Sequence, residues 1–216
     1  MAGSDRCDFT SMTRGLGESW LIVDAEYKAY PSIARIIPAY FATQELVKEH
    51  AIKPADVKRV TVQSGHIRLV NDFNPRSEVD AQFSLPFVVV MAITQEPLGP
   101  AMYSESRMFD PLVRDLLGRV ELQQDDDAEK VFFDEQRLKM SVSIALQSGV
   151  TVQRDIEYPR DQKPMGWNGV ENKFKTLSKD MLQSARIDEA INIVGALDKE
   201  PNLDSLLASV CVTSWL

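Results

Sequence analysis

The sequence is poor in cysteine and histidine. Its 216 residues include two of each. Cys7 and Cys211 allow one disulfide at most, so a secreted scaffold held by disulfides is not expected and a reducing compartment fits best. HExxH and paired CxxC motifs are missing, which leaves a zinc enzyme without support. We therefore predict no metal ion.

Long hydrophobic runs and clustered positive charge are missing as well. The longest apolar run, FSLPFVVVMAI at 83–93, is far shorter than the roughly twenty residues that span a bilayer. The start MAGSDRCDFT has no apolar segment of the kind found in signal peptides. A net charge of −8 and a pI near 4.9 argue against a nucleic-acid surface. These features predict a cytoplasmic protein that binds neither membrane nor nucleic acid.

Common catalytic motifs are not found either. The sequence has no GxSxG nucleophile elbow and no P-loop. The acidic run Asp125, Asp126 and Asp127 with Glu129 lacks the glycine and the ligand spacing of a calcium loop. We interpret it as a solvated loop.

One helical pattern follows the tripeptide Tyr-Pro-Ser at 30–32. Apolar residues recur at helical spacing and predict one apolar helix face, formed by Ile33, Ile36, Ile37, Tyr40 and Phe41. The helix is expected to reach His50, with a kink or restart at Pro38.

A second helix is predicted over the apolar run at 83–93, because the run is long for a strand despite its valines. Ser84 is expected to cap it. Phe83, Leu85 and Phe87 are expected to pack inward.

The remaining patterns predict a mixed sheet. Residues 110–118 begin with Asp-Pro and end with glycine, which is typical of a helix. A short strand is predicted to follow at 120–122. Alternating apolar residues predict a strand around 60–62 and a β-hairpin formed by 140–146 and 150–156. The fold class is α+β: a two-layer mixed sheet with a β-hairpin packed against helices.

The two histidines are expected to have different roles. His50 falls at a helix C-terminus, where the dipole favours a cation, so a structural role is expected. His66 follows a strand and is the one histidine that could act as a general acid or base. A surface or structural role for His66 stays open.

Five segments, taken together and in order, resemble the second domain of the MmgE/PrpD family. They are GLGESWLIVDAEYKAYPS, KPADVKRVTV, VDAQFSLPFVVVMAI, FDPLVRDLLGRVEL and ENKFKTL. The resemblance covers residues 12–207, with tails at 1–11 and 208–216. In that family a larger helical domain comes first and the second domain closes over it as a lid. We expect that helical domain to be absent from this chain.

The resemblance implies a lyase acting on aconitate- or alkylcitrate-type polycarboxylates, without metal or organic cofactor. Decarboxylation as in cis-aconitate decarboxylase is preferred over dehydration as in 2-methylcitrate dehydratase. Lys28 matches the lysine of the KxYP motif and is predicted to bind a substrate carboxylate, with Arg35 as a second candidate. A solvated Lys28 is the alternative. Family members usually carry a histidine just after KxYP, and residues 32–41 contain none.

Two function classes stay open. In the first, the chain is part of a lyase whose pocket is completed by a second copy of the chain or by a separate helical domain. In the second, it is a non-catalytic remnant of a lid domain that binds a partner or a carboxylate. A lid without its partner would expose apolar surface, which favours association over an isolated monomer.

Overall fold

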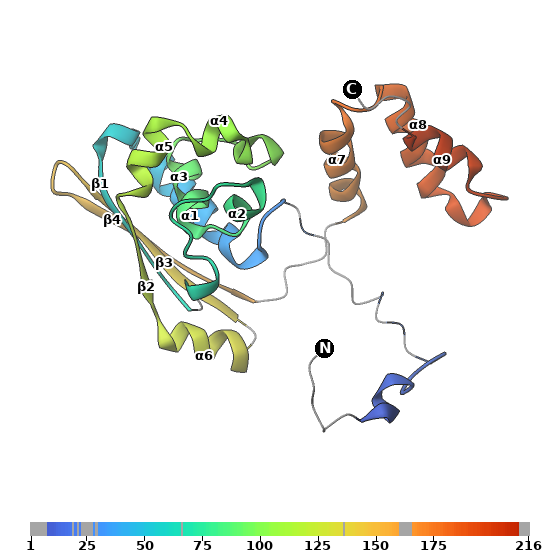
Figure 1. The fold of residues 1–216 in the computed structure, drawn as a ribbon, viewed down its shortest axis with the longest axis horizontal. Helices are drawn as coiled ribbons and strands as arrows, with labels where there is room; N and C mark the ends of the chain where they lie inside the picture. Colours follow the sequence, from blue (N-terminus) through green and yellow to red (C-terminus); the bar gives the residue numbers. More distant parts are fainter. Residues whose placement is uncertain are drawn as a thin grey trace. The chain divides into compact units, whose positions relative to one another are not determined.

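The computed structural model describes residues 8–18, 20, 22, 28, 30–65, 67–135, 137–159 and 166–211. The chain divides into two compact units. Lys28–Lys163 form the first, here named the sheet unit. Met1–Tyr27 and Pro164–Leu216 form the second, here named the helical unit (Figure 1). Across the described residues no helix is long and apolar enough to cross a membrane.

The sheet unit contains one four-stranded mixed sheet with strand order β2-β1-β3-β4. β1 pairs in parallel with β2 and antiparallel with β3, and β4 pairs antiparallel with β3. The strands are β1 Val57–Ser64, β2 Val120–Gln124, β3 Arg137–Leu146 and β4 Thr151–Pro159. The fold class and the hairpin predicted from the sequence are confirmed.

A tight turn closes the β3–β4 hairpin. Gly149 has a φ of 89°, which falls in the left-handed region that glycine adopts without strain. Its N–H donates to the carbonyl of Leu146 at 3.0 Å. The turn fixes a register in which Ile144 lies opposite Val152. Alternate residues of β3 consequently turn the same way, and Met140, Val142 and Ile144 are buried.

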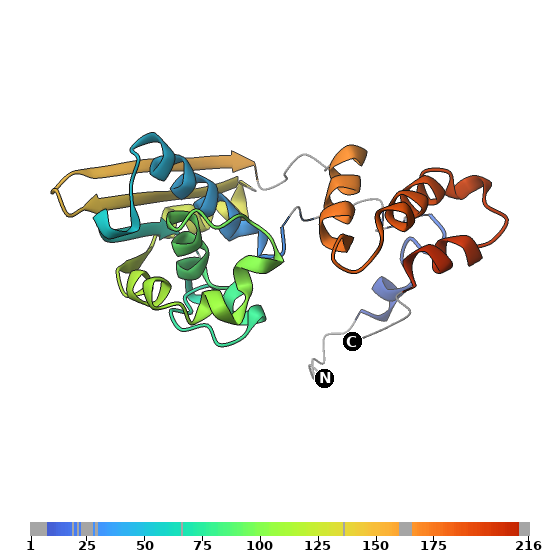
Figure 2. The ribbon, with the colours of Figure 1, turned by 90° about the horizontal axis from the view of Figure 1, so that it is seen from above.

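Helices cover one face of this sheet, as Figures 1 and 2 show. α3 lies at the centre of the unit, packs against α1 and α5, and is buried at every one of its nine residues. A helix that is apolar all round needs neighbours on every side. The helices of the sheet unit are α1 Ile37–Glu49, α2 Glu78–Gln82, α3 Leu85–Ile93, α4 Glu105–Met108, α5 Pro111–Leu117 and α6 Asp126–Asp134.

The predicted restart at Pro38 is confirmed. A 3-10 turn spans Ala34–Ile36, and α1 begins at Ile37 with Pro38 in its first turn. Proline is tolerated there because the first helical N–H groups have no intrahelical acceptor. His50 is the C-cap of α1, as expected.

The predicted apolar face of this segment is only partly correct. Ile36, Ile37 and Tyr40 are buried and Ile33 packs against the core, as predicted, but Phe41 is 36% exposed. The ring of Phe41 meets the rings of Tyr30 and Tyr40 edge to face.

The capping predictions are confirmed. Ser84 Oγ accepts a hydrogen bond from the Phe87 N–H at 3.0 Å. Asp110 accepts from the Leu112 N–H at 2.8 Å, and Gly118 is the C-cap of α5. The prediction for Phe83 was wrong, because this side chain is 47% exposed. It is the C-cap of α2, and the chain changes direction there before α3 begins.

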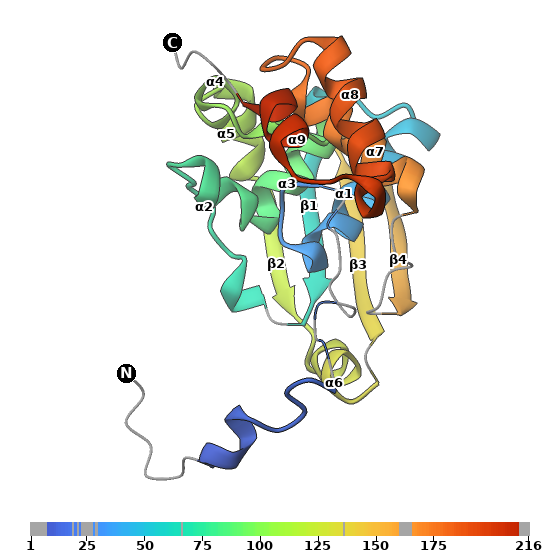
Figure 3. The ribbon, with the colours of Figure 1, turned by 90° about the vertical axis from the view of Figure 1, so that its right-hand side faces the viewer.

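The acidic run is a helix rather than the predicted loop. Asp125 caps α6 by accepting from the N–H groups of Asp127 and Ala128 at 3.0 and 2.9 Å. Carboxylates in the first turn are also favoured by the helix dipole. Within the described part of the chain no group of acidic, histidine or cysteine side chains could hold a metal ion. In Figure 3, α6 lies at the ends of β1 and β2.

The described residues of the helical unit form a short N-terminal 3-10 turn and three α-helices. The turn spans Phe9–Met12. The helices are α7 Trp167–Ser178, α8 Ser184–Gly195 and α9 Asp204–Val210. α8 packs against both α7 and α9.

Candidate functional site

Two of the segments that resemble the family, the KxYP motif at 28–31 and AQFSLP at 81–86, meet at one backbone carbonyl. Ser32 Oγ donates a hydrogen bond to the carbonyl of Gln82 at 2.8 Å, and the N–H of Ile33 donates to the same oxygen at 3.2 Å. Ser32 directly follows the KxYP motif, and Gln82 belongs to AQFSLP. A carbonyl oxygen has two lone pairs, so it can accept both bonds. The chain after Lys28 is therefore hydrogen-bonded to the last residue of α2, just before the central helix α3 begins.

The AQFSLP side of this junction is itself anchored. Ser84 Oγ donates to the carbonyl of Asp72 at 2.5 Å while it caps α3. The N–H of Leu85 donates to the carbonyl of Val70 at 2.9 Å. Ser84 is fully buried, and a buried hydroxyl is stable only when its hydrogen bonds are made. The motif holds the loop before α2 against the N-terminus of α3.

Lys28 lies exposed at the beginning of the sheet unit. Two residues later Tyr30 is half-buried, and its ring meets Phe41 edge to face with centroids 5.7 Å apart. Phe41 in turn meets Tyr40 edge to face at 5.5 Å. An exposed ammonium next to an anchored aromatic side chain can approach an anion with a limited loss of chain entropy.

Tyr40 is held by a network of hydrogen bonds beneath this segment. It is 2% exposed, and its hydroxyl donates to the carbonyl of Glu96 at 2.6 Å. Gln44 Nε2 donates to the same hydroxyl at 3.1 Å. Burial raises the pKa of Tyr40 above its ordinary value of 10.0. The Glu96 carboxylate forms an ion pair with Arg107 at 2.5 Å. Tyr40 thus stays neutral and fully hydrogen-bonded.

Tyr103 is the exception among the buried tyrosines of the sheet unit. It is 0% exposed, and its ring stacks on Phe87 with centroids 6.2 Å apart. Its hydroxyl has no hydrogen-bond partner among the described residues. Burial raises the pKa of Tyr103, and the nearby Ser32 hydroxyl acts in the opposite direction.

Arg35 lies in a different setting from Lys28. Its guanidinium carbon is 5.0 Å from the centroid of the Phe132 ring on α6, which is a cation–π geometry. The side chain is half-buried. It lines a pocket barely large enough for one water molecule, together with Ser64, Gly65, Ala128, Phe132, Leu138 and Lys139. The predicted role of Arg35 in substrate binding stays a prediction.

The other residues singled out from the sequence give little further chemistry. His66 lies outside the described residues, so its predicted role in proton transfer stays a prediction. Cys211 is a free, exposed thiol, and Cys7 is outside the described residues. The apolar pattern predicted Tyr40 on the inner face of its helix but not its hydrogen bonds, and it did not indicate Tyr103. Tyr103 occurs in PAMYSESR, where no periodic pattern marks it as buried.

These features define an α+β domain. It has a mixed sheet and a buried central helix, and its KxYP segment is hydrogen-bonded to the Gln82 carbonyl. Comparison with known families then identifies it. The MmgE/PrpD C-terminal domain matches residues 30–199, and the chain therefore belongs to the MmgE/PrpD family. Lys28 comes just before the matched range.

Two curated relatives share this region. The chain is 28% identical over 189 residues to human cis-aconitate decarboxylase, covering 83% of this chain and 39% of that protein. It is 25% identical over 189 residues to the cis-aconitate decarboxylase of Mus musculus, covering 83% of this chain and 38% of that protein. The chain thus spans about two fifths of the length of these relatives.

Proposed function

We propose that the chain supplies the carboxylate-binding part of a lyase of the cis-aconitate decarboxylase type, with Lys28 as the cation that binds the substrate. The main support is the pair of hydrogen bonds to the Gln82 carbonyl, which fixes the chain just after Lys28 against the end of α2. Family membership and two cis-aconitate decarboxylase relatives support the substrate class.

The chemistry explains why a cation is needed. In the decarboxylation of cis-aconitate, the bond between a carbon and one carboxyl group breaks and carbon dioxide leaves. The electron pair stays on carbon, is delocalised toward a remaining carboxylate, and is quenched by a proton. A positioned ammonium stabilises the charge that builds on that carboxylate, and more strongly where water is excluded.

The proposal extends to three further points. Arg35 is a second cation for a polycarboxylate, and as a guanidinium it holds anions but does not donate protons at ordinary pH. His66 is the candidate proton carrier within the chain. Dehydration of an alkylcitrate is the alternative reaction, because it builds similar anionic charge. Neither metal nor organic cofactor is needed in this proposal.

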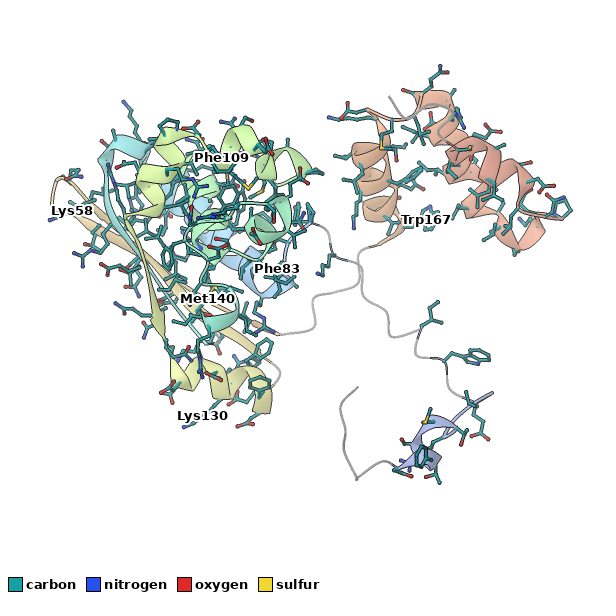
Figure 4. All side chains as sticks on the ribbon, in the orientation of Figure 1. Lys58, Phe83, Phe109, Lys130, Met140 and Trp167 are labelled. Carbon is teal, nitrogen blue, oxygen red and sulfur yellow. The ribbon has the colours of Figure 1, made fainter. Side chains whose placement is uncertain are left out.

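Partners and location are also part of the proposal. Phe83 is exposed next to the motif junction (Figure 4), and an exposed aromatic side chain at that place is consistent with a partner surface. We propose that a second copy of the chain or a separate helical domain completes the pocket. The scarcity of cysteine supports a cytoplasmic setting.

The test is turnover of cis-aconitate and of 2-methylcitrate by the purified chain, measured as carbon dioxide release and as alkene formation. Lys28→Ala is expected to lower kcat/KM by about 100-fold, the size of effect found when a positioned electrostatic group is lost. Lys58→Ala is the matched control. Lys58 is an exposed lysine at the opposite end of the sheet unit from Phe83 (Figure 4), and its loss should leave turnover unchanged.

A non-catalytic role is the second candidate, and one sequence feature favours it. Residues 32–41 contain no histidine, so the segment after KxYP lacks the group that family members usually place there. Under this alternative the chain binds cis-aconitate in a calorimetric titration, Lys28→Ala weakens that binding, and neither protein releases carbon dioxide. Activity that is equal in wild type and Lys28→Ala would contradict the role of Lys28.

A further inference from the structure

Phe41 is an exposed aromatic side chain on a stretch of α1 that is otherwise buried. It is 36% exposed, whereas Ile37, Tyr40 and Ala42 around it are buried. Its ring does not belong to the hydrophobic core of the sheet unit. Within the described part of the chain, its ring contacts are with Tyr30 and Tyr40. What Phe41 does is therefore defined by these two contacts rather than by burial in the core.

The contact with Tyr40 gives Phe41 a fixed neighbour. The two rings meet edge to face with centroids 5.5 Å apart and an angle of 87° between their planes. Tyr40 is 2% exposed, and its hydroxyl is hydrogen-bonded both to the Glu96 carbonyl and to Gln44. A buried ring with a hydrogen-bonded tip has little freedom to move. Phe41 is consequently held against an immobile side chain of its own helix.

The contact with Tyr30 connects this helix to the KxYP motif. The rings of Phe41 and Tyr30 lie edge to face, with centroids 5.7 Å apart and 62° between their planes. Aromatic pairs favour this geometry, and it contributes more than the buried area alone. Tyr30 is the tyrosine of the motif and is half-buried. Phe41 therefore holds the motif tyrosine in place.

The length of chain between each anchor and Lys28 decides which anchor matters for its position. A chain extends by at most about 3.5 Å per residue, so Lys28 lies within about 7 Å of Tyr30 and within about 14 Å of Ser32. The hydrogen bonds from Ser32 and Ile33 to the Gln82 carbonyl thus leave Lys28 a wide range of positions. The contact between Tyr30 and Phe41 restricts that range much more.

Resting on the proposed function, we propose that Phe41 is a positioning residue for the carboxylate-binding lysine. It acts through Tyr30 and touches no substrate atom. The ring contact is present in the free chain, so binding requires no rearrangement of the motif. A carboxylate then meets a preorganised ammonium group, and less conformational entropy is lost on binding.

The experiment measures binding by the full chain, with cis-aconitate and its saturated analogue propane-1,2,3-tricarboxylate as probes in titration calorimetry. Phe41→Leu keeps an apolar side chain but removes the ring, and the Kd should increase about fivefold. Phe41→Tyr keeps the ring and should bind like the wild type. Phe109→Leu is the matched control, because Phe109 (Figure 4) is 53% exposed and its ring faces Arg114. Its Kd should not change.

Two further measurements distinguish positioning from a general effect on packing. In a Lys28→Ala background, Phe41→Leu should weaken binding no further, because Phe41 acts through Lys28. Relaxation of backbone 15N nuclei in the free chain should show a lower order parameter at Lys28 in Phe41→Leu than in the wild type or in Phe109→Leu.

The possible outcomes separate this inference from the proposed function. Equal Kd values for the wild type and Phe41→Leu would overturn the inference and leave the proposed function standing, as would a further loss of binding when Phe41→Leu is added to Lys28→Ala. Failure of the wild type to bind either probe, with the order at Lys28 lowered in Phe41→Leu, would overturn the proposed function but not the control of Lys28 by Phe41. Failure to bind with unchanged order would overturn both.

Discussion

The two units of this chain hold their structure by different means. The contiguous hydrophobic core runs from Ile36 to Ile156 and lies wholly in the sheet unit. In α7 to α9, the buried apolar residues are Ile187 and Ala190. Large apolar side chains on these helices are exposed instead, including Trp167 at 50% (Figure 4) and Leu207 at 60%.

The difference indicates where stability comes from. Burial of apolar surface is the main favourable term in folding, and a fully buried side chain contributes about 1.5–3 kcal/mol. The sheet unit has a central helix with no exposed face. In the helical unit, α7 to α9 depend on contacts along the seam around Ile187. We infer that the sheet unit unfolds at a higher denaturant concentration than α7 to α9.

Tryptophan makes this comparison measurable. The three tryptophans are Trp20, Trp167 and Trp215, and none lies in residues 28–163. Fluorescence therefore reports on the helical unit, while circular dichroism at wavelengths sensitive to strands reports on the sheet unit. Urea unfolding followed by both signals should give two transitions.

The largest effect is expected for Phe87→Ala. This side chain is fully buried in α3, and its removal should lower the free energy of unfolding of the sheet unit by about 3–5 kcal/mol. Leu177→Ala, at a position 43% exposed on α7, should change stability by less than about 1 kcal/mol. Urea unfolding by circular dichroism measures both. Equal losses in the two variants would mean that the units do not differ as inferred.

The next effect concerns the seam of α7 to α9. Ile187→Ala should lower the free energy of unfolding of these helices by about 2 kcal/mol. This value is near the lower end of the range for isoleucine-to-alanine substitutions, because helices with few neighbours can relax into the space that is left. The tryptophan transition should move to lower urea while the circular dichroism transition of the sheet unit stays in place. A common shift of both transitions would show that the units unfold together.

A smaller effect is expected at Gly65, at the end of β1. A Cβ there would come within 2.7 Å of the backbone N and Cα of Glu129, and backbone cannot move as a flexible side chain can. Gly65→Ala should therefore destabilise the sheet unit by about 1–3 kcal/mol. Gly99→Ala is the matched control, since a Cβ at Gly99 meets nothing within 4 Å. Thermal unfolding of both variants decides whether α6 is packed as closely as described.

The smallest effect is expected for two exposed carboxyl groups, one in each unit. The hydroxyl of Ser77 lowers the pKa of Asp80 below its ordinary value of 3.8, with help from the backbone of Arg76. The hydroxyl of Thr10 does the same for Asp8. A lowered pKa adds stability that is present above pH 3.8 and is lost as the pH falls through the folded-state value. Carboxyl titration by NMR should place both groups below 3.8, and Ser77→Ala should move Asp80 back toward it.

Local signals in the sequence predicted most of the fold. Ser84, Asp110, Pro111 and Gly118 act through neighbours along the chain, so caps and helix ends could be placed without the structure. The alternation in β3 and β4 likewise fixed the hairpin. The failures at Phe83 and Asp125 occurred where one local rule competed with another: a change of chain direction at Phe83, and a capping carboxylate in an acidic run at Asp125.

The candidate site was less predictable. Lys28 came from a motif, but the Gln82 carbonyl that fastens its segment is a backbone atom and leaves no trace in residue identity. The Tyr40 hydroxyl donates to the carbonyl of Glu96 across 56 positions of sequence, a long-range relation that spacing along the chain does not encode. Both contacts depend on packing between segments that are distant in the sequence.

The position of β1 in the sheet sets the order in which the chain can fold during synthesis. Val60 pairs with Val120 on one side and with Ile144 on the other. Both partner strands leave the ribosome long after β1 does. Both edges of β1 therefore stay unpaired until most of the sheet unit has been made. Contacts of this separation form slowly, and unpaired strand edges are sites of aggregation. A nascent chain that stalls before residue 120 is therefore the form most in need of a chaperone.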